Sequence, residues 1–546
     1  QIGAVIGREF SYELISAVTD RGDDAMRAGL DQLVDAGLVF QRGLLPEATF
    51  LFKHALVQDA AYGTLLKGRR QHLHARIAHM MEQRIPDSAS TRPELIASQY
   101  AQAGLAEKAI EYWDKAGRLA VRRSTMAEAA VHFGKALQLL RTLPKSSQQR
   151  SGEIALQLDL AATLTAVKGW ASREAGEAYT HARELCRDAP EGPELAMALN
   201  GLRLILLNRA EFGAARQVAA ELLGVAARQN DPDAKLTSYY AYGVTLLFQA
   251  EFTGALQHLR QAIAIHNRSI NRSLASVPVD PCIEARSFAA WALVGARSFT
   301  AWALLLLGYP DQALALSREA VASARELGYP YTLAYSLHVN CVFHQLFGDA
   351  TTVLERSKEL VALATKQGFP HLVGSGTFFR AWATMALGGS IQDAIGEMRQ
   401  GLATKRATGA EIKVPYYYGL LAEAHGRTNR TTEGLNLLSE ALELAERTDE
   451  RWYEAELCRF SGEMLITNAD RPGAEPWLSR ALAEARKQGA KFFELRAATS
   501  MARLWRDQGK RQEARELLAP VYGWFTEGFD THDLKEAKAL LEELEA

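Results

Sequence analysis

The hydrophobic and polar positions of this 546-residue chain repeat with a period of about 40 residues. Nine times between residues 175 and 521, a small or slim residue lies seven positions before another. The pairs are Ala175/Ala182, Ala215/Leu222, Ala255/Ala262, Ala313/Ala320, Val353/Leu360, Ala394/Gly401, Gly434/Ala441, Ala474/Ala481 and Ala514/Val521, and their steps are 40, 40, 58, 40, 41, 40, 40 and 40 residues. Residues seven apart share one helix face, so each pair predicts a helix that a neighbouring backbone can approach closely. The fixed period predicts a solenoid of stacked helical units.

We call pairs of this kind slim pairs. An aromatic-rich segment and a polar turn precede most of the helices that carry them, as in TFFRAWATMALGG before IQDAIGEMRQGL. Aromatic side chains on the first helix fill the gap that the small residues of the second helix leave. This pattern resembles the tetratricopeptide repeat, lengthened from roughly 34 to roughly 40 residues. The expected fold class is therefore mainly α, a tetratricopeptide-like α-solenoid of helix pairs.

The step from Ala255 to Ala313 is the one irregular interval. There the segment ARSFAAWAL at 285–293 recurs as ARSFTAWAL at 296–304, eleven residues later. Eleven residues make almost three whole helical turns, so both copies present one stripe on a continuous helix. The sequence predicts an overlong helix from Glu284 to Leu307, preceded by a polar loop over 267–281, as an insertion around 267–307.

The first 85 residues lack the 40-residue repeat and predict a mixture of helices and strands. Ser11 is placed to cap a helix with Leu14, Ile15 and Val18, and a second helix begins at Asp23 or Asp24 and ends at Gly37. Two β-like runs at 38–41 and 49–52 predict a hairpin, and helical segments follow at 54–66 and 69–83. Residues 1–85 are therefore expected to form a winged-helix-like α+β module.

The stretch 86–93, which holds two prolines, predicts a linker, because proline and small polar residues continue neither the helical nor the strand pattern of hydrophobic residues. A first set of repeats over 94–145 carries the pairs Ala109/Ala116 and Ala129/Ala136, only 20 residues apart. That short step predicts one long helix shared by two neighbouring units. The superhelix is expected to run over 146–546.

Composition narrows the class of protein. A net charge of -2 gives no basic excess, which disfavours direct binding of nucleic acid. Four scattered cysteines without a CxxC pair are typical of buried thiols in the cytoplasm. The longest apolar stretch, 288–307, carries Arg297 at its centre, so we expect no membrane span. Because the chain begins at Gln1 without a signal peptide, we expect it to be the back part of a longer protein.

Motifs of catalysis are missing from the sequence. It holds no GxxxxGK[ST] phosphate loop, no HExxH, no GxSxG elbow and no paired-cysteine site. We therefore expect no catalytic residue, no metal and no cofactor in this chain, and no enzyme activity of its own. The GxG of Gly374 and Gly376 predicts a turn.

Two histidine clusters have weaker patterns. His338, Cys341 and His344 have i, i+3, i+6 spacing, which favours core or groove positions over a metal site. The histidines of the segment 69–83 are His72, His74 and His79, and we expect them to be solvated or boundary residues, since Leu73, Ile77 and Met80 form the apolar side.

One segment indicates a protein family more specifically than these patterns do. FLFKHALVQDAAYGTLLKGRRQHLHARIAHMME, residues 50–82, resembles the end of the winged-helix domain in bacterial STAND ATPases (signal-transduction ATPases with numerous domains). It is most similar to those that join a class III adenylate/guanylate cyclase, an AAA-type ATPase and a tetratricopeptide tail. IGAVIGREFSYELISAV at 2–18 and SQYAQAGLAEKAIEYWDKAG at 98–117 are similar to the same proteins. The resemblance covers about residues 1–140, and the later repeats match in architecture only.

This resemblance implies a nucleotide switch. In related STAND proteins, the histidine of a Met-His-Asp motif contacts bound ADP and holds the molecule closed, and by position that histidine is His54 here. Ala55 stands where the motif has its acidic residue. The alternative is that His54 caps its helix and packs on the wing. The basic residues Lys67, Arg69 and Arg70 either face the nucleotide domain or, as we favour, form a solvated helix face.

The functional hypothesis that follows is a regulatory and sensor region with no catalysis of its own. Its expected partners are upstream ATPase and cyclase domains, which would hold ATP or ADP, and a protein, peptide or small-molecule inducer in the concave groove. Oligomerisation on activation is possible within this scheme. Two alternatives stay open: the sensor region of an ATP-dependent transcriptional activator of the maltose-regulator type, and a simple repeat adaptor.

Overall fold

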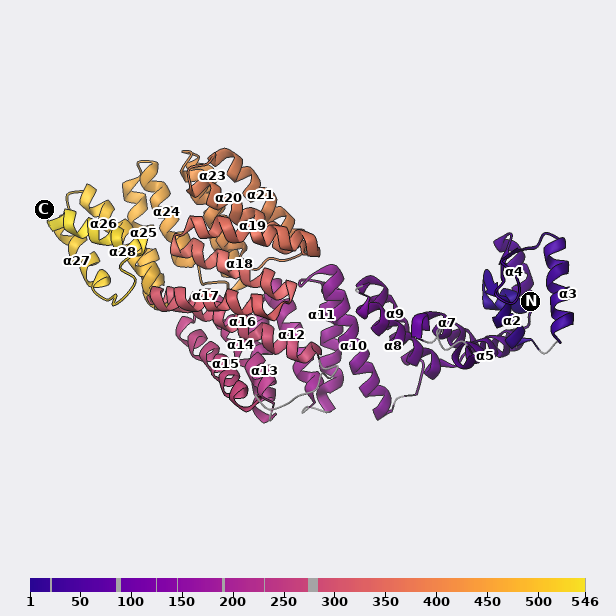
Figure 1. Ribbon diagram of the computed structural model, residues 1–546. Coiled ribbons are helices and arrows are strands. Elements are labelled where there is room, and N and C mark those ends of the chain that lie inside the picture. The colour runs from indigo at the N-terminus through magenta and orange to yellow at the C-terminus, as the bar shows by residue number, and fades with distance from the viewer. Residues whose placement is uncertain are drawn as a thin grey trace. The chain divides into compact units, whose positions relative to one another are not determined.

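The computed structural model describes residues 1–19, 22–84, 90–123, 125–144, 146–188, 192–229, 231–273 and 283–545. It forms two compact units, Gln1–Val167 and Lys168–Ala546 (Figure 1). Both are dominated by helices, and the few strands all lie in the first unit, so the predicted mainly α class is confirmed. The predicted boundaries at residues 85 and 145 fall inside the first unit and stay predictions.

The first part of unit one is an α+β module. Its elements are α1 (Ile2–Ile6), β1 (Glu9–Ser11), α2 (Tyr12–Val18), α3 (Asp23–Asp35), β2 (Val39–Arg42), β3 (Thr49–Phe52), α4 (Ala55–Gly63) and α5 (Lys67–Arg84). The strands form an antiparallel sheet in the order β1-β3-β2, with Glu9 opposite Leu51 and Val39 opposite Phe52. Ser11 caps α2 by accepting a hydrogen bond from the Leu14 amide. The predicted helices and hairpin are confirmed, whereas α1 and β1 were not predicted.

Four helices complete unit one. They are α7 (Pro93–Ala103), α8 (Ala106–Arg122), α9 (Met126–Leu140) and α10 (Ser147–Lys168). The prediction of one long helix through both slim pairs is wrong, because α8 carries Ala109/Ala116 and α9 carries Ala129/Ala136 as separate helices. The two helices pack where the Phe133 ring fills the space that Gly117 leaves by having no Cβ. Slim residues thus occur on consecutive helices here, which the sequence period could not distinguish from one helix. The first half of the predicted linker, residues 86–89, lies outside the described residues, and α7 begins at Pro93.

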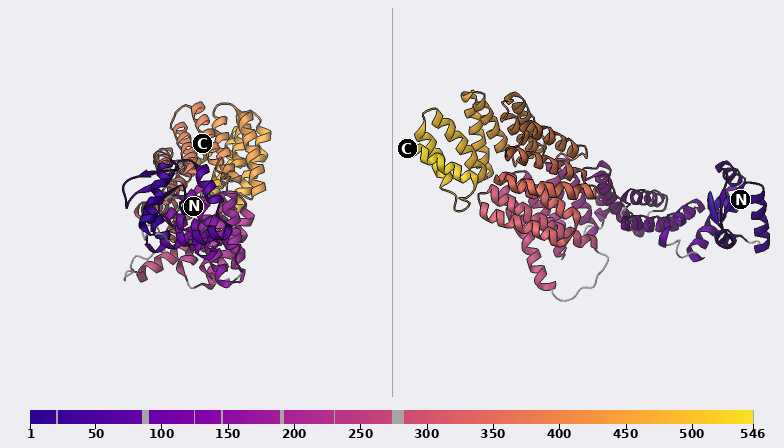
Figure 2. Two further views of the ribbon diagram at one scale, coloured as in Figure 1. Left: turned by 90° about the vertical axis from the view of Figure 1, so that its right-hand side faces the viewer. Right: turned by 45° about the horizontal axis from the view of Figure 1, so that its top comes forward.

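Unit two is built from helical hairpins, which Figure 2 shows stacked side by side. Its elements are α11 (Arg173–Leu185), η1 (Cys186–Asp188), α12 (Pro193–Asn208), α13 (Phe212–Arg228), α14 (Pro232–Phe248), α15 (Phe252–Ser273), α16 (Ile283–Leu306), α17 (Pro310–Leu327), α18 (Pro330–Phe347), α19 (Ala350–Gln367), α20 (Pro370–Ala386), α21 (Ile391–Arg406), α22 (Val414–Gly426), α23 (Thr431–Thr448), α24 (Glu454–Thr467), α25 (Arg471–Gln488), α26 (Lys491–Asp507), α27 (Arg511–Tyr522) and α28 (His532–Glu545). All nine slim pairs are buried, and each lies on an odd-numbered helix from α11 to α27, the second helix of its repeat. The predicted tetratricopeptide-like solenoid is confirmed.

The irregular interval contains the expected long helix. The 24-residue α16 begins one residue before the predicted start, and it buries Phe299 and Trp302 of the second sequence copy completely. The predicted loop over 267–281 is wrong in its first part, because α15 continues to Ser273. No proline or glycine interrupts 262–273, so nothing in that segment stops the helix. Residues 274–282 lie outside the described part of the chain.

Gly374 and Gly376 do not form a turn as predicted but lie inside α20. A Cβ on Gly374 would lie 2.5 Å from the Gly401 carbonyl oxygen, and one on Gly401 would lie 2.6 Å from the Gly374 carbonyl oxygen. These glycines therefore allow the backbones of α20 and α21 to touch. The prediction failed because the requirement for glycine comes from packing against the next helix, α21, and not from a local turn.

Repeats about five positions apart also meet in unit two. The Asn208 carbonyl at the end of α12 accepts backbone hydrogen bonds from Glu411 (2.8 Å) and Ile412 (3.2 Å), just before α22. The Phe248 carbonyl at the end of α14 likewise accepts from Arg451 (2.9 Å) and Trp452 (3.2 Å), before α24. Buried aromatic rings from α14, α16, α22 and α24 pack between these turns. The inner face of the superhelix is therefore filled by side chains over this stretch.

Candidate functional site

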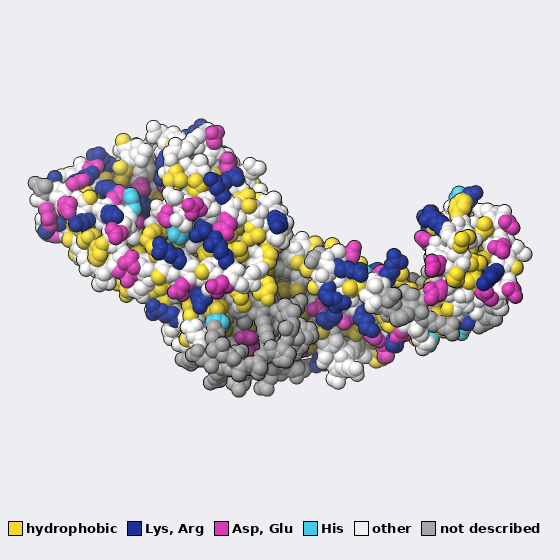
Figure 3. Space-filling model, viewed as in Figure 1, with side chains coloured by type: hydrophobic (Ala, Val, Ile, Leu, Met, Phe, Trp, Pro, Cys, Tyr) yellow, Lys and Arg dark blue, Asp and Glu magenta, His cyan; other side chains and the backbone are white. Residues whose placement is uncertain are grey.

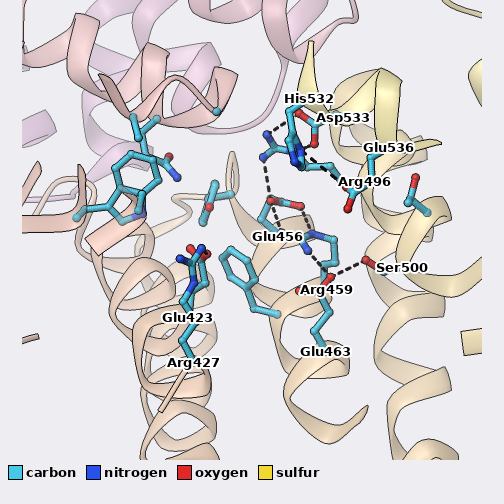
Figure 4. Close-up of a pocket in the computed structure, with 18 of the residues that line it drawn as sticks. Glu423, Arg427, Glu456, Arg459, Glu463, Arg496, Ser500, His532, Asp533 and Glu536 are labelled. Atoms are coloured by element: carbon cyan, nitrogen blue, oxygen red, sulfur yellow. Dashed lines mark hydrogen bonds and ion pairs between the residues drawn. The ribbon is translucent and has the colours of Figure 1, made fainter. Parts of the chain in front are cut away.

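The first helices of four consecutive repeats, α22, α24, α26 and α28, line a mixed-charge pocket with the end of α18. Its volume is about 440 Å³. Four arginines and five acidic residues line it together with His532: Arg427, Arg459, Arg496, Arg503, Glu423, Glu456, Glu463, Asp533 and Glu536. We call this the Glu456 pocket (Figure 4). Its charge of both signs distinguishes it from the apolar interior beside it.

Glu456 is the centre of the pocket's ion-pair network. Its side chain is only 1% exposed, and it accepts hydrogen bonds from Arg459 Nε at 2.6 Å and Arg496 Nη1 at 3.2 Å. Burial alone would raise the pKa of this carboxyl, but the two guanidinium groups outweigh burial and hold its pKa below the ordinary value. Glu456 thus joins α24 to α26 through Arg496.

Arg496 connects three parts of unit two. It donates to Asp533 Oδ1 at 2.7 Å on α28 and to the Leu346 carbonyl oxygen at 2.5 Å at the end of α18. Although burial disfavours the charge, Asp533 and Glu456 raise the pKa of Arg496 above its ordinary value. The arginine therefore holds α18 against repeats that lie far along the chain.

The rim of the pocket is more exposed. Glu463 accepts hydrogen bonds from Arg459 Nη1 (2.6 Å) and from the Ser500 hydroxyl (2.7 Å), and it is 38% exposed. Arg427, which pairs with Glu423 at 2.7 Å, is 43% exposed, and Arg503 pairs with Glu536. Figure 4 shows Arg427, Glu463 and Glu536 around one space, and they come from the end of α22, from α24 and from α28. A ligand that carries both charges can exchange partners with these rim pairs.

We did not predict this pocket from the sequence. The sequence did contain a pattern that indicates the pocket. Arg496 forms a hydrogen bond with Asp533, and Ser500 forms one with Glu463, and the residues of each pair lie 37 positions apart. This separation is slightly shorter than the repeat, and it aligns side chains on the first helices of adjacent repeats. Charged residues spaced in this way would have predicted the network.

His54 lies at the N-cap of α4, is exposed, and makes no side-chain cap hydrogen bond. The structure therefore does not support the alternative that its ring caps the helix. Its proposed contact with nucleotide is not tested and stays a prediction. Lys67 and Arg69 are exposed as favoured, whereas Arg70 donates to the Leu65 carbonyl oxygen at 2.7 Å and lies over the Tyr62 ring. Arg70 thus stabilises the turn after α4.

The expectation for His74 is wrong. It is 5% exposed and lies within hydrogen-bond distance of the Tyr62 hydroxyl (3.0 Å) and Gln99 Oε1 (2.6 Å), while His72 and His79 are exposed. The Gln99 amide in turn donates to the Ile6 carbonyl oxygen at 3.2 Å. His74 therefore joins α4 and α5 to α7. The pattern of hydrophobic residues in α5 could not predict this burial, because α7 is a separate helix.

The cluster of His338, Cys341 and His344 is buried in α18, as the core interpretation predicts. Across the described ranges, no group of three or more His, Cys, Asp or Glu residues is arranged to hold a metal ion. Cys186, Cys341 and Cys458 are free and buried, while Cys282 lies outside the described residues.

The visible surface of the C-terminal helices carries basic and acidic side chains interspersed rather than separated (Figure 3). This agrees with the net charge of -2. Within the described part of the chain, no helix is both long enough and apolar enough to span a membrane.

Comparisons with known proteins give distant similarities. No family model matches this chain. A protein of Rhizobium meliloti (strain 1021), described only as uncharacterized, is 24% identical over 505 residues, which make up 92% of this chain and 48% of that protein. The chain therefore spans about half the length of the curated relative that it matches.

Three solved structures illustrate the range of likeness, each 12% identical to this chain. A Rap protein complexed with competence and sporulation factor has a TM-score of 0.49 and covers 70% of this chain and 99% of its own. The Cut9–Hcn1 hetero-tetramer structure has a TM-score of 0.46, with 90% and 91% covered. A STAND protein with a tetratricopeptide repeat sensor from Pyrococcus horikoshii has a TM-score of 0.30, with 100% and 64% covered.

Proposed function

We propose that this chain is the regulatory and sensor region of a larger signalling protein, and that its superhelix binds a polypeptide segment in the Glu456 pocket. The observation that carries the proposal is the ion-pair network around Glu456. Glu456 is buried, yet its two arginine partners line a space of about 440 Å³. Burying ions is costly, and a hydrophobic contact of the same size would hold the helices at least as well. A binding role explains why charges occupy this position.

The rim pairs indicate the chemistry of the ligand. Because Arg427, Arg503, Glu423 and Glu536 present both signs within one space, the ligand is a segment with basic and acidic side chains. Charge pairs of this kind set register and reject wrong partners more than they add affinity. The bound segment would bridge α18 to α26 and α28, and so favour one arrangement of the repeats.

The parent protein is proposed on the sequence resemblance of residues 1–140. In this proposal the α1–α5 module is the winged helix of a STAND ATPase, and His54 faces ADP or ATP held by an upstream domain. ATP hydrolysis and adenylate or guanylate cyclase activity belong to the parent's other domains, and activation is accompanied by oligomerisation. The relative from Rhizobium meliloti is about twice the length of the matched region, which leaves room for such domains.

The binding role is tested by panning a phage-displayed library of random peptides against the purified chain. Enriched peptides should carry both charges and should bind the double variant Arg427→Ala/Arg503→Ala at least about tenfold more weakly. A matched control is Arg325→Ala/Arg515→Ala, which removes two arginines of similar exposure outside the pocket. No enrichment, or equal loss in both double variants, would refute the proposed site.

The proposal of a chain without catalysis is tested separately. The purified chain is incubated with ATP and Mg²⁺, and released phosphate and cyclic AMP are measured. Neither product is expected above the level of a heat-denatured sample. Turnover that co-purifies with the chain would contradict the assignment.

A further inference from the structure

A second cavity in unit two is cationic and deeply buried. It lies between α12, α18, α20 and the connection from α21 to α22, and has a volume of about 30 Å³. Arg203, Lys405 and Lys413 line it, and none of the described residues that line it is acidic. The three side chains belong to residues that are 0%, 3% and 2% exposed. We call this the Arg203 cavity.

Arg203 has unused hydrogen-bonding capacity. Its Nη2 donates to Asn200 Oδ1 at 3.3 Å, but Nε and Nη1 are buried without a hydrogen-bond partner. The guanidinium lies 5.9 Å from the centroid of the Tyr240 ring, which is uncharged because burial raises the pKa of its hydroxyl. A buried guanidinium without an anion is unfavourable. Two donors of this group are therefore positioned for a partner that the chain does not supply.

The lysines are only partly compensated. Lys405 Nζ donates to the carbonyl oxygens of Ala410 and Ile412, both at 2.8 Å, and these are neutral acceptors. Glu450 is near both lysines, and it accepts hydrogen bonds from the Lys413 backbone amide and from Trp452 Nε1, each at 3.0 Å. Glu411 also acts on Lys405, but no carboxylate is among the groups that act on Arg203. Burial lowers the pKa of Lys405 to about 7 and that of Lys413 to about 8, and the positive charge of Lys413 lowers the pKa of Lys405 further.

The aromatic walls and the small size define what fits. Tyr240, Trp291, Tyr331 and Tyr335 surround the cations, and the space admits roughly two or three water-sized groups. A carboxylate or phosphate head group has that size and accepts several charge-assisted hydrogen bonds. From these contacts we infer that the Arg203 cavity binds the oxyanion head group, carboxylate or phosphate, of a small ligand.

The position of the cavity connects it to the closure of the superhelix. Arg203 lies on α12, and the backbone of the α21–α22 connection already bonds to Asn208 at the end of that helix. An oxyanion held between Arg203 and Lys405 would tie together two repeats that lie one superhelical turn apart. The Arg203 cavity is a second site, separate from the proposed peptide site in the Glu456 pocket. Anion binding is measurable in the isolated chain even if the Glu456 pocket binds no peptide.

The test measures thermal unfolding of the purified chain in sodium phosphate, sodium acetate, sodium benzoate or sodium chloride at equal ionic strength. Saturable stabilisation by phosphate or by the carboxylates, absent in chloride, is the expected result. Phosphate alone would identify a phosphorylated ligand, and acetate or benzoate a carboxylic acid. Equal shifts in all four salts would overturn the inference.

Two variants locate the effect. Arg203→Met replaces an uncompensated buried cation by an apolar side chain of similar length, so the salt-free variant should unfold at the same or a higher temperature. It should lose the anion response at least about tenfold in apparent affinity. The control Arg209→Met removes an exposed arginine at the end of the same helix and should keep the full response. A less stable Arg203→Met variant with an unchanged response would contradict the site.

If Arg203→Met does not fold, Lys405→Met provides the same measurement from the other wall. Isothermal titration of the wild-type chain with phosphate and benzoate gives the direct affinity. No heat of binding for either anion, at concentrations where the thermal shift saturates, would overturn the inference.

Discussion

The indole rings of Trp302 and Trp452 meet edge to face, with centroids 4.6 Å apart and planes at 89°. They come from α16 and from the residues just before α24, so the contact joins two different turns of the superhelix. Both side chains are fully buried. The stability of unit two therefore depends on contacts across turns, and not only on contacts between adjacent repeats.

Trp452→Ala is expected to destabilise unit two by about 3–5 kcal/mol, because it removes a large buried ring and leaves a cavity. Hydrogen exchange followed by mass spectrometry should show lost protection in α14 and α16 as well as in α22–α26. Leu387→Ala, at a position 51% exposed, is the control and should change little. Loss of protection confined to α22–α26 would mean that the turns do not support one another.

Gly374→Ala is expected to destabilise the contact between α20 and α21 by about 1–3 kcal/mol, since its Cβ would lie 2.5 Å from the Gly401 carbonyl oxygen. Gly396→Ala is the matched control on α21, because a Cβ there meets nothing within 4 Å. That control should stabilise the helix by about 0.5–1 kcal/mol through its better helix propensity. Urea unfolding of both variants measures the two effects, and equal signs would contradict the packing argument.

The sequence predicted what depends on neighbours along the chain. The slim pairs, the hairpins and the long helix α16 follow from local periodicity, because each repeat packs first against the next. The contact between Trp302 and Trp452 could not be predicted in this way. The contact depends on a small rotation per repeat that accumulates over four repeats, from α16 to α24, and no residue of either helix encodes the accumulated rotation.

The same reason explains why the Arg203 cavity was missed, because Arg203 and Lys405 line one cavity only where α12 meets the connection before α22. Gly374 is a different case: Gly401 lies on the next helix of the same hairpin, but the GxG pattern by itself does not reveal a contact between two helices. Arg203 did carry a signal, since it interrupts the apolar run LNGLRLILL. A charged residue at the centre of an apolar run indicates a buried charge, and Arg203 lines a buried cavity.

The stability of the N-terminal unit is expected to fall in acid because of His74. Burial lowers the pKa of this imidazole, opposed by the Gln99 hydrogen bond, so the folded state keeps it neutral. The unfolded chain takes up the proton as the pH falls below the ordinary value of 6.5, and the stabilisation that is complete above that value is then lost. Hydrogen exchange of α5 and α7 at about pH 8 and about pH 5, corrected for intrinsic rates, measures the loss.

His74→Gln cannot titrate, and it should reduce this pH dependence while keeping a polar partner for Gln99. His72→Gln, on the exposed face of the same helix, should behave like the wild-type chain. A pH dependence that is the same in all three proteins would exclude His74 as its source.

The last prediction concerns His54 in the full-length parent. The ring is exposed at the start of α4 and bound to no cap, so it is free to donate to a nucleotide phosphate from a neighbouring domain. A hydrogen bond to a charged group contributes about 1.5–3 kcal/mol, so His54→Ala should speed ADP release by roughly tenfold or more. Nucleotide content after gel filtration measures retention, and His72→Ala is the control for removing an exposed histidine.

Because Ala55 stands in place of the acidic residue of the related motif, Ala55→Asp is the complementary variant, and it should slow ADP release if the switch works as in STAND proteins. Unchanged ADP retention in both His54→Ala and Ala55→Asp would remove His54 from the nucleotide site and leave the α1–α5 module without a role in nucleotide sensing through this residue.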